Sequence, residues 1–292
     1  MLPLFARAGA AMIPGASRLP LLGGARSREV PDLVLTLKDA AVDRDRLAAY
    51  DRVCRFPLRD QLPATYPHML AFPLQLALMT DASFPFPALG LVHIANRIVQ
   101  LRPIDASERL DLKVWATPLE PHPRGTQFTL RSEARAGDAL VWEECSTILK
   151  RGGGSGEGGA ARRESRADEQ QGMKRSDEEL PVTATWRLPG DLGRRYGSVS
   201  GDLNPIHMHP LSARLFGFPT AIAHGMWTKA RCLAALDPRL PDRFTVEVEF
   251  RKPILLPATV EFSEREDAEG IRFAVRGAGK KTPHLDGEVS FG

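Results

Sequence analysis

The amino-acid sequence predicts an α+β protein of two similar halves, each a curled antiparallel sheet wrapped around one helix. Both halves follow the same order, in which a helical segment precedes a series of strand-like runs separated by turn signals. In addition, IVQLRPI at 98–104 is echoed by VEFRKPI at 248–254, so proline and isoleucine align at a spacing of 150 residues. This pattern indicates a degenerate internal duplication.

The first half begins with a short strand and a helix for which Asp43 is the predicted N-cap. A turn-rich segment at 63–72 then leads, through Phe72-Pro73, into a short apolar helix. Alternating apolar and polar residues follow, which is typical of strands with one buried face. The predicted elements are a strand at 33–37, helices at 43–55 and 74–79, and strands at 91–101, 110–119, 127–135 and 139–150.

The second half repeats this order after a strand at 182–188. Phe218-Pro219 precedes its main helix at 225–236, where Met226, Ala230, Leu233 and Leu236 fall at helical spacing. The remaining predicted elements are a short helix at 209–216 and strands at 244–251, 259–266, 271–276 and 285–291.

Composition divides the chain into four regions. Residues 151–180 are dense in glycine and charge and poor in large apolar residues, which is typical of a flexible linker. Residues 1–29 contain arginines and three prolines, and we expect an N-terminal arm that lies on the protein. The predicted domains are therefore the halves at 30–150 and 181–292.

Charge and cysteine content limit the class of protein. The 292 residues carry a net charge of only +3, which argues against a nucleic-acid-binding body. Three scattered cysteines show no metal-binding spacing and indicate free thiols in a reducing compartment. No apolar run is long enough to span a membrane, and we expect a cytoplasmic protein without a membrane partner.

The segment at 196–225 contains the candidate catalytic residues. Within it, YGSVSGDLNPIH at 196–207 places Asp202, Asn204 and His207 in a run of turn-forming residues. Asn204 precedes a proline and is therefore biased towards extended geometry. The sequence thus predicts an acid and an imidazole presented from a loop, where they could exchange protons with a substrate. This loop occurs in only one half, so we expect one site per chain.

This motif, followed after five intervening residues by Ala213, resembles the hydratase signature of the MaoC-like family, which contains R-specific enoyl-CoA hydratases and uses the hotdog fold. The resemblance is strong over 182–292 and weaker over 30–150, which is similar to the worn first repeat of a double-hotdog member. It implies that Asp202 and His207 form a catalytic dyad on one water, with Asn204 holding the dyad or the water. It also implies that the Gly225 amide receives the thioester oxygen.

The activity so implied is reversible, R-specific hydration of trans-2-enoyl-CoA to 3-hydroxyacyl-CoA, a hydro-lyase reaction, with no metal and no cofactor other than coenzyme A within the substrate. Candidate substrate contacts are Arg251 and Lys252, for phosphates, together with Tyr196 and His224. Lys280-Lys281 and Arg194-Arg195 are further cationic candidates, while the segments at 74–79 and 84–89 are candidates for the acyl pocket. His209 is expected to cap a helix or lie on the surface.

Several alternatives remain open on the sequence alone. A hotdog acyl-CoA thioesterase and a non-catalytic acyl-CoA-binding subunit both fit the predicted fold, because fold does not settle function. The absence of a G-x-S-x-G elbow argues against a serine hydrolase. The acyl carrier could be coenzyme A or an acyl carrier protein, and pairing of two chains as a homodimer is left open.

Overall fold

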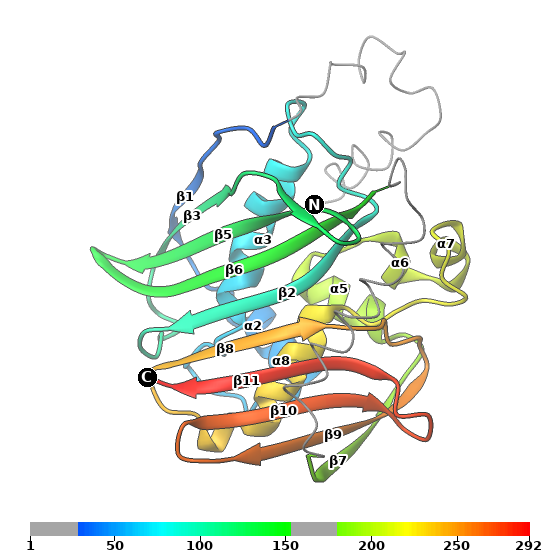
Figure 1. Ribbon diagram of the computed structural model, residues 1–292. Coiled ribbons are helices and arrows are strands. Elements are labelled where there is room, and N and C mark those ends of the chain that lie inside the picture. The colour runs from blue at the N-terminus through cyan, green and yellow to red at the C-terminus, as the bar shows by residue number, and fades with distance from the viewer. Residues whose placement is uncertain (1–28, 153–179) are drawn as a thin grey trace.

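The structure of the protein is a computed structural model that describes residues 29–152 and 180–292. Over these residues the strands form one antiparallel sheet, and the helices pack against one of its faces (Figure 1). The predicted arm at 1–29 and the predicted linker at 151–180 lie outside the described residues, apart from their edges. None of the described helices is both long and apolar enough to cross a membrane.

The first half contributes the strands at one end of the sheet and two helices. Five of its strands match the predicted strands to within a few residues, whereas β4 was not predicted because Pro121 within it and Pro123 after it mark a turn. The strands are β1 (Leu35–Ala40), β2 (Leu91–Gln100), β3 (Leu110–Ala116), β4 (Glu120–His122), β5 (Gly125–Ala136) and β6 (Ala139–Arg151), and the helices are α2 (Arg44–Cys54) and α3 (Tyr66–Met79).

The second half contributes the other end of the sheet, and its strands also match the prediction closely. It carries several short helices before its main helix. The strands are β7 (Val182–Leu188), β8 (Phe244–Phe250), β9 (Ala258–Glu266), β10 (Gly270–Gly277) and β11 (Pro283–Phe291), and the helices are α5 (Leu192–Ser200), α6 (Pro205–Met208), α7 (Pro210–Leu215), α8 (Gly225–Leu236) and η2 (Asp237–Arg239).

The two halves meet where β2 pairs with β8. The strands run β1-β3-β5-β6-β2-β8-β11-β10-β9-β7, so the second half repeats the order of the first in reverse. Arg97 lies opposite Glu247 at this seam, and their side chains form an ion pair of 2.7 Å. These positions are 150 residues apart, the spacing of the sequence echo, as expected if a two-fold axis passes between them. The two predicted sheets are therefore joined edge to edge into one.

Helix α8 is the central helix of the second half. It spans the predicted range, and Met226, Ala230, Leu233 and Leu236 are all buried. The concave face of the sheet covers these side chains, and burial of each larger one contributes roughly 1.5–3 kcal/mol. This packing fixes the position of the first residue of α8, Gly225.

The start of α2 also follows the prediction. The Asp43 carboxylate accepts hydrogen bonds from the backbone N–H groups of Asp45 and Arg46, at 3.0 and 3.1 Å. Such a cap satisfies donors that the first turn of a helix otherwise leaves unpaired.

Helix α3 begins earlier than predicted. The segment at 63–72 was expected to be turn-rich, but α3 starts at Tyr66 and includes Pro73 in its interior. Pro67 lies in the first turn, where a missing N–H costs nothing, and burial of much of the helix outweighs the cost of Pro73. Phe72-Pro73 therefore lies within a helix, whereas Phe218-Pro219 precedes one. The two motifs are not structurally equivalent.

Candidate active site

Asp202 lies in the turn that follows α5, as expected for a loop residue. The helix ends at Gly201, whose φ of +80° is left-handed and whose N–H donates to Gly197 O at 2.9 Å. The Asp202 carboxylate then accepts the Asn204 N–H through Oδ1 at 3.1 Å. One carboxylate oxygen is thus tied to the backbone, which orients the whole group.

Asn204 caps the next helix. Its side-chain oxygen accepts the Ile206 N–H at 3.3 Å, and its carbonyl accepts the His207 N–H at 3.0 Å. His207 therefore lies on the short helix α6 rather than on a loop, which corrects the sequence prediction. The reason is that Pro205 occupies the first helical position, where its fixed φ favours helix formation.

The orientation of the His207 ring is set by the backbone. Its Nδ1 lies 2.8 Å from Ile222 O, so Nδ1 carries the hydrogen and donates it to this carbonyl. The other nitrogen, Nε2, is then left with a lone pair. A neutral imidazole held in this way can accept a proton.

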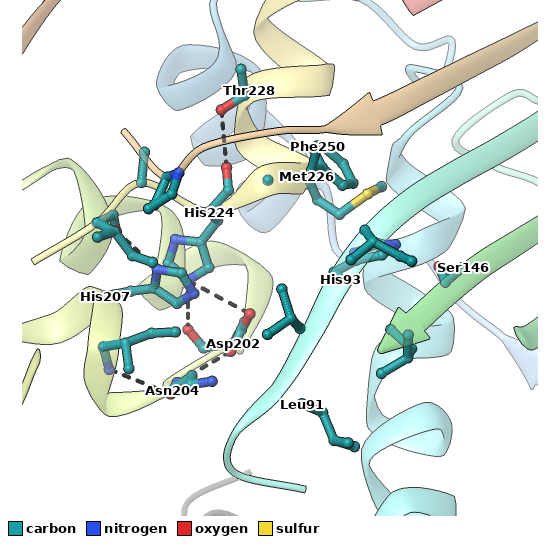
Figure 2. Close-up of a pocket in the computed structure, with 18 of the residues that line it drawn as sticks. Leu91, His93, Ser146, Asp202, Asn204, His207, His224, Met226, Thr228 and Phe250 are labelled. Atoms are coloured by element: carbon teal, nitrogen blue, oxygen red, sulfur yellow. Dashed lines mark hydrogen bonds and ion pairs between the residues drawn. The ribbon is translucent and has the colours of Figure 1, made fainter. Parts of the chain in front are cut away.

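His224 packs against His207. The two rings are stacked with centroids 3.6 Å apart, and the Tyr196 ring lies 4.9 Å beyond His224. His224 Nε2 donates to Asp202 O at 3.1 Å and lies 3.7 Å from Asp202 Oδ2 (Figure 2). Tyr196 and His224, predicted as substrate contacts, both line the pocket and also pack beside the acid and the imidazole.

Burial determines the charge of both imidazoles. It lowers the pKa of His207, and the nearby Asp202 carboxylate opposes this only in part. It lowers the pKa of His224 well below its ordinary value, and the adjacent His207 lowers it further. Both rings are therefore neutral at neutral pH, the form in which His207 can act as a base.

Two glycines of α5 allow α6 to approach closely. A Cβ on Gly193 would lie 2.0 Å from the His207 carbonyl oxygen, and one on Gly197 would lie 2.9 Å from Asp202 O. No larger residue fits between α5 and the chain that carries the acid and the imidazole. We did not predict this role for Gly193, although its spacing of four residues from Gly197 is a signal of close packing.

Arg46 of α2 reaches the same loop from the first half. Its guanidinium donates to Val199 O at 2.7 Å and to Ser200 O at 3.1 Å, at the end of α5. It thereby satisfies carbonyls that the last turn of a helix leaves unpaired. No sequence signal could reveal this contact, because the residues are more than 150 positions apart.

Gly225 is the first residue of α8 and lines the same pocket as Asp202 and His207. The preceding residue supplies no side-chain cap to the helix, and the Gly225 N–H makes no hydrogen bond with the described residues. A Cβ at this position would lie 3.1 Å from the Phe250 ring, so glycine allows this ring to pack closely against the start of α8. Because this N–H has no partner in the described part of the chain and lies at a helix N-terminus, it can donate a hydrogen bond to an oxygen atom of a ligand.

The pocket is a cavity of about 280 Å³ lined by both halves. Its polar wall is formed by Asp202, Asn204, His207, His224 and Gly225 from the second half. Its apolar wall includes side chains of the segments that we predicted for the acyl pocket, together with the start of β2: Leu76, Met79, Ala88, Leu89, Leu91 and Val92.

Cationic side chains border this pocket. Arg251 and Lys252 both line it, as predicted, but Arg251 is engaged by Glu249 at 2.5 Å and by Asp286 at 2.8 Å. Arg124 and Arg151 of the first half also line it and were missed, because only the pairing of β5 with β6 brings them there.

The other cationic candidates lie elsewhere. Neither Lys280-Lys281 nor Arg194-Arg195 lines the pocket. Lys281 pairs with Glu261, and Arg194 donates to Met208 O at 3.2 Å. His209 caps α7 by accepting the Leu211 N–H at 3.1 Å, as expected of a capping residue.

Asp202, His207 and His224 are also close enough to be considered as metal ligands, since their ligating atoms lie within 4.8 Å of one another. The two rings are stacked, however, so their in-plane lone pairs run side by side rather than converging on one point. His207 Nδ1 and His224 Nε2 are in addition committed to backbone carbonyls. The expectation that the site works without a metal stays a prediction.

Comparison with known proteins identifies the family. The family described as MaoC like domain matches residues 168–282. A second match, to a curated protein of Mycobacterium tuberculosis, is 36% identical over 275 residues, which is 94% of each chain. The chain therefore belongs to the MaoC-like dehydratase family.

The curated relative is named 3-hydroxyacyl-thioester dehydratase X. The crystal structure of HtdX from the same organism superposes with a TM-score of 0.75 at 35% identity, covering 88% of this chain and 99% of that one. A MaoC-like dehydratase from Phytophthora capsici shares the fold, with a TM-score of 0.68 at 20% identity and coverage of 91% and 95%.

Proposed function

We propose that the protein is an acyl-thioester hydratase and dehydratase. It adds water reversibly across the 2,3 double bond of a trans-2-enoyl thioester and forms the (R)-3-hydroxyacyl thioester. The observation that carries this proposal is the neutral His207, whose Nε2 lone pair lies beside Asp202 in a pocket that also holds the Gly225 N–H. The relative named 3-hydroxyacyl-thioester dehydratase X supports the same reaction class.

In the hydration direction, Asp202 and His207 hold one water between them. One member of the pair takes a proton from this water as its oxygen bonds to C3, and the pair then delivers that same proton to C2, so both members return to their starting state. The π electrons of the double bond move onto C2 and the thioester carbonyl, which gives an enolate. They then form the new C2–H bond. The lone pair on His207 Nε2 suits the first role, and the pair can titrate as a unit.

The enolate oxygen is received by the Gly225 N–H in this proposal. This N–H lies at the N-terminus of α8, where the helix dipole favours negative charge. Loss of one such donor typically costs about 2.7–4 kcal/mol of barrier. Asn204 acts indirectly, because it caps the helix that carries His207 and so fixes the position of the imidazole.

The architecture fits a double hotdog with one active site per chain. Each half supplies a run of strands around one main helix, α3 or α8, and the halves join at β2 and β8. Only the second half carries the acid and imidazole. The first half instead gives part of the pocket wall, through α3 and β2.

We propose that the thioester is carried by coenzyme A or by an acyl carrier protein. Either carrier brings a phosphate towards the cations at the pocket, of which Lys252, Arg124 and Arg151 form no ion pair with the described residues. The cysteines at 54, 145 and 232 are unpaired, which supports a reducing compartment and a cytoplasmic location.

The experiment that tests the proposed function is a pair of assays on one substrate panel. The protein is incubated with trans-2-enoyl-CoA thioesters of increasing length, and loss of enoyl absorbance and release of free thiol are both followed. We expect loss of absorbance without thiol release, and an R-configured product. Thiol release would identify a thioesterase instead, and tight binding without turnover would identify a non-catalytic subunit.

A further inference from the structure

A cluster of buried polar side chains lies in the first half, at the pocket. Glu144 of β6 is its centre: its carboxylate accepts from His68 Nδ1 at 2.7 Å, Asn96 Nδ2 at 2.8 Å and Gln75 Nε2 at 2.9 Å. All four side chains are buried. These contacts lower the pKa of Glu144 to about 2 in spite of its burial, so the carboxylate is ionised.

Part of this cluster has a structural role. Asn96 Oδ1 accepts from Lys229 Nζ at 2.5 Å, and Lys229 is a fully buried residue of α8. The ammonium also donates to Asn96 O and Val246 O, each at 3.2 Å, across the seam between the halves. Burying such charges is costly unless every partner is satisfied, so a purely structural network would use all its hydrogen bonds internally.

This network does not: hydrogen-bonding groups of its members, and of the neighbouring His93, are left unused on residues that line the pocket. His93 Nε2 is buried and has no partner among the described residues. The His68 ring donates to Glu144 through Nδ1, and its Nε2 makes no hydrogen bond with the described part of the chain. Ser146 accepts from Asn96 at 3.0 Å, and its own hydroxyl hydrogen has no acceptor among the described residues.

These groups lie across the cavity from the acid and the imidazole. Figure 2 shows His93 and Ser146 on the strand side of the pocket, opposite Asp202 and His207. The His93 ring packs edge-on against Phe250 at 5.0 Å, and Phe250 is the ring that borders Gly225. A thioester held at Gly225 would therefore meet the polar groups further along its acyl chain.

The unused groups include a donor and an acceptor. Ser146 offers an O–H. His93 offers a lone pair, because burial lowers its pKa to about 4 and the nearby charge of His68 adds to this effect, so the ring is neutral. His68 Nε2 is a third polar atom of the set. A hydroxyl group, which donates and accepts at once, satisfies such a set, whereas a methylene chain would leave it unsatisfied.

We propose that His68, His93 and Ser146 form a site for a hydroxyl group on the acyl chain, so that the preferred substrates are 2-enoyl thioesters with a hydroxyl group beyond C3. This inference rests on the proposed hydratase function. The hydroxyl group accepts from Ser146 and donates to the lone pair of His93, with His68 Nε2 beside them. An analogue without it leaves these polar groups unpaired, which is the situation in which enzymes discriminate strongly.

The test compares matched substrates. Enoyl-CoA thioesters of equal length, plain or with a hydroxyl group at each successive carbon beyond C3, are assayed for hydration. We expect one hydroxylated isomer to exceed the plain chain in kcat/KM by roughly ten- to hundredfold. Equal rates for all isomers would overturn this inference and leave the hydratase function standing. Failure to hydrate any substrate would overturn the proposed function itself, and this inference with it.

Two serines provide a matched pair of variants. Ser146→Ala removes the free O–H and should reduce the preference for the hydroxylated chain about tenfold. Ser132 accepts from Gln75 at 2.9 Å within the same network but does not line the pocket, so Ser132→Ala should retain the preference. An equal loss in both variants would show that the network acts only structurally and would refute the site. If Ser146→Ala does not fold, His93→Leu gives the same readout, because it leaves no charge unpaired.

Discussion

The contact between Gly193 and α6 leads to a quantitative prediction. In Gly193→Ala the new Cβ would lie 2.0 Å from the His207 carbonyl oxygen, whereas carbon and oxygen need about 3.3 Å. The backbone that carries His207 must then move by about 1 Å, and a displacement of this size typically costs about 100-fold in rate. Overpacking should also lower the free energy of unfolding by about 1–3 kcal/mol.

The assay measures kcat/KM for hydration of a short enoyl thioester together with the thermal midpoint. Gly190→Ala is the matched control, because its Cβ would meet only Pro257 Cδ at an ordinary 3.8 Å. We expect the control to behave like the wild type and Gly193→Ala to lose about two orders of magnitude in kcat/KM. A Gly193→Ala variant with wild-type activity and midpoint would refute the claim that this glycine positions His207.

Three further predictions follow from the contacts and pKa shifts. Because burial lowers the pKa of His207 below 6.5, the acid limb of kcat/KM should lie below pH 6.5, and a limb above that value would contradict a neutral base. Burial lowers the pKa of His93 to about 4, so at this residue the folded chain binds fewer protons than the unfolded chain between pH 6.5 and 4. Stability should therefore fall as pH drops through this window, with about 3 kcal/mol of the fall due to His93, and His93→Leu should lose that share while the shares of His207 and His224 remain. Arg46→Met removes the hydrogen bonds to the end of α5 and should lower kcat about tenfold, whereas Arg52→Met, an exposed substitution on the same helix, should not; equal kinetics in the two variants would exclude a positioning role.

Local patterns in the sequence were sufficient to predict much of this fold. Helix α8 was predicted to its ends because its apolar side chains keep helical spacing and a glycine precedes them. Helix α3 was predicted too short because Pro67 and Pro73 signal a break, whereas tertiary burial sustains the helix through both. Propensity is thus reliable where packing agrees with it and fails where packing overrides it.

The candidate site also contains some residues that local sequence patterns predict and others that they do not. Asp202 and His207 belong to one contiguous motif, so the sequence alone could point to them. The contact of His68, which lines the pocket, with Glu144 could not be predicted, because the two residues are 76 positions apart and meet only when α3 packs on β6. Contacts between distant elements carry no local signal, and these are the contacts that support the dyad and shape the acyl pocket.

The central claim is that Asp202 and His207 transfer the protons of hydration, and its most direct test is the hydration rate of Asp202→Asn and His207→Ala with crotonyl-CoA. The account predicts that each variant keeps the wild-type thermal transition and loses at least about 100-fold in kcat, since one positioned proton-transfer group typically contributes 10²–10⁴-fold. Turnover close to the wild-type rate in either folded variant would contradict it.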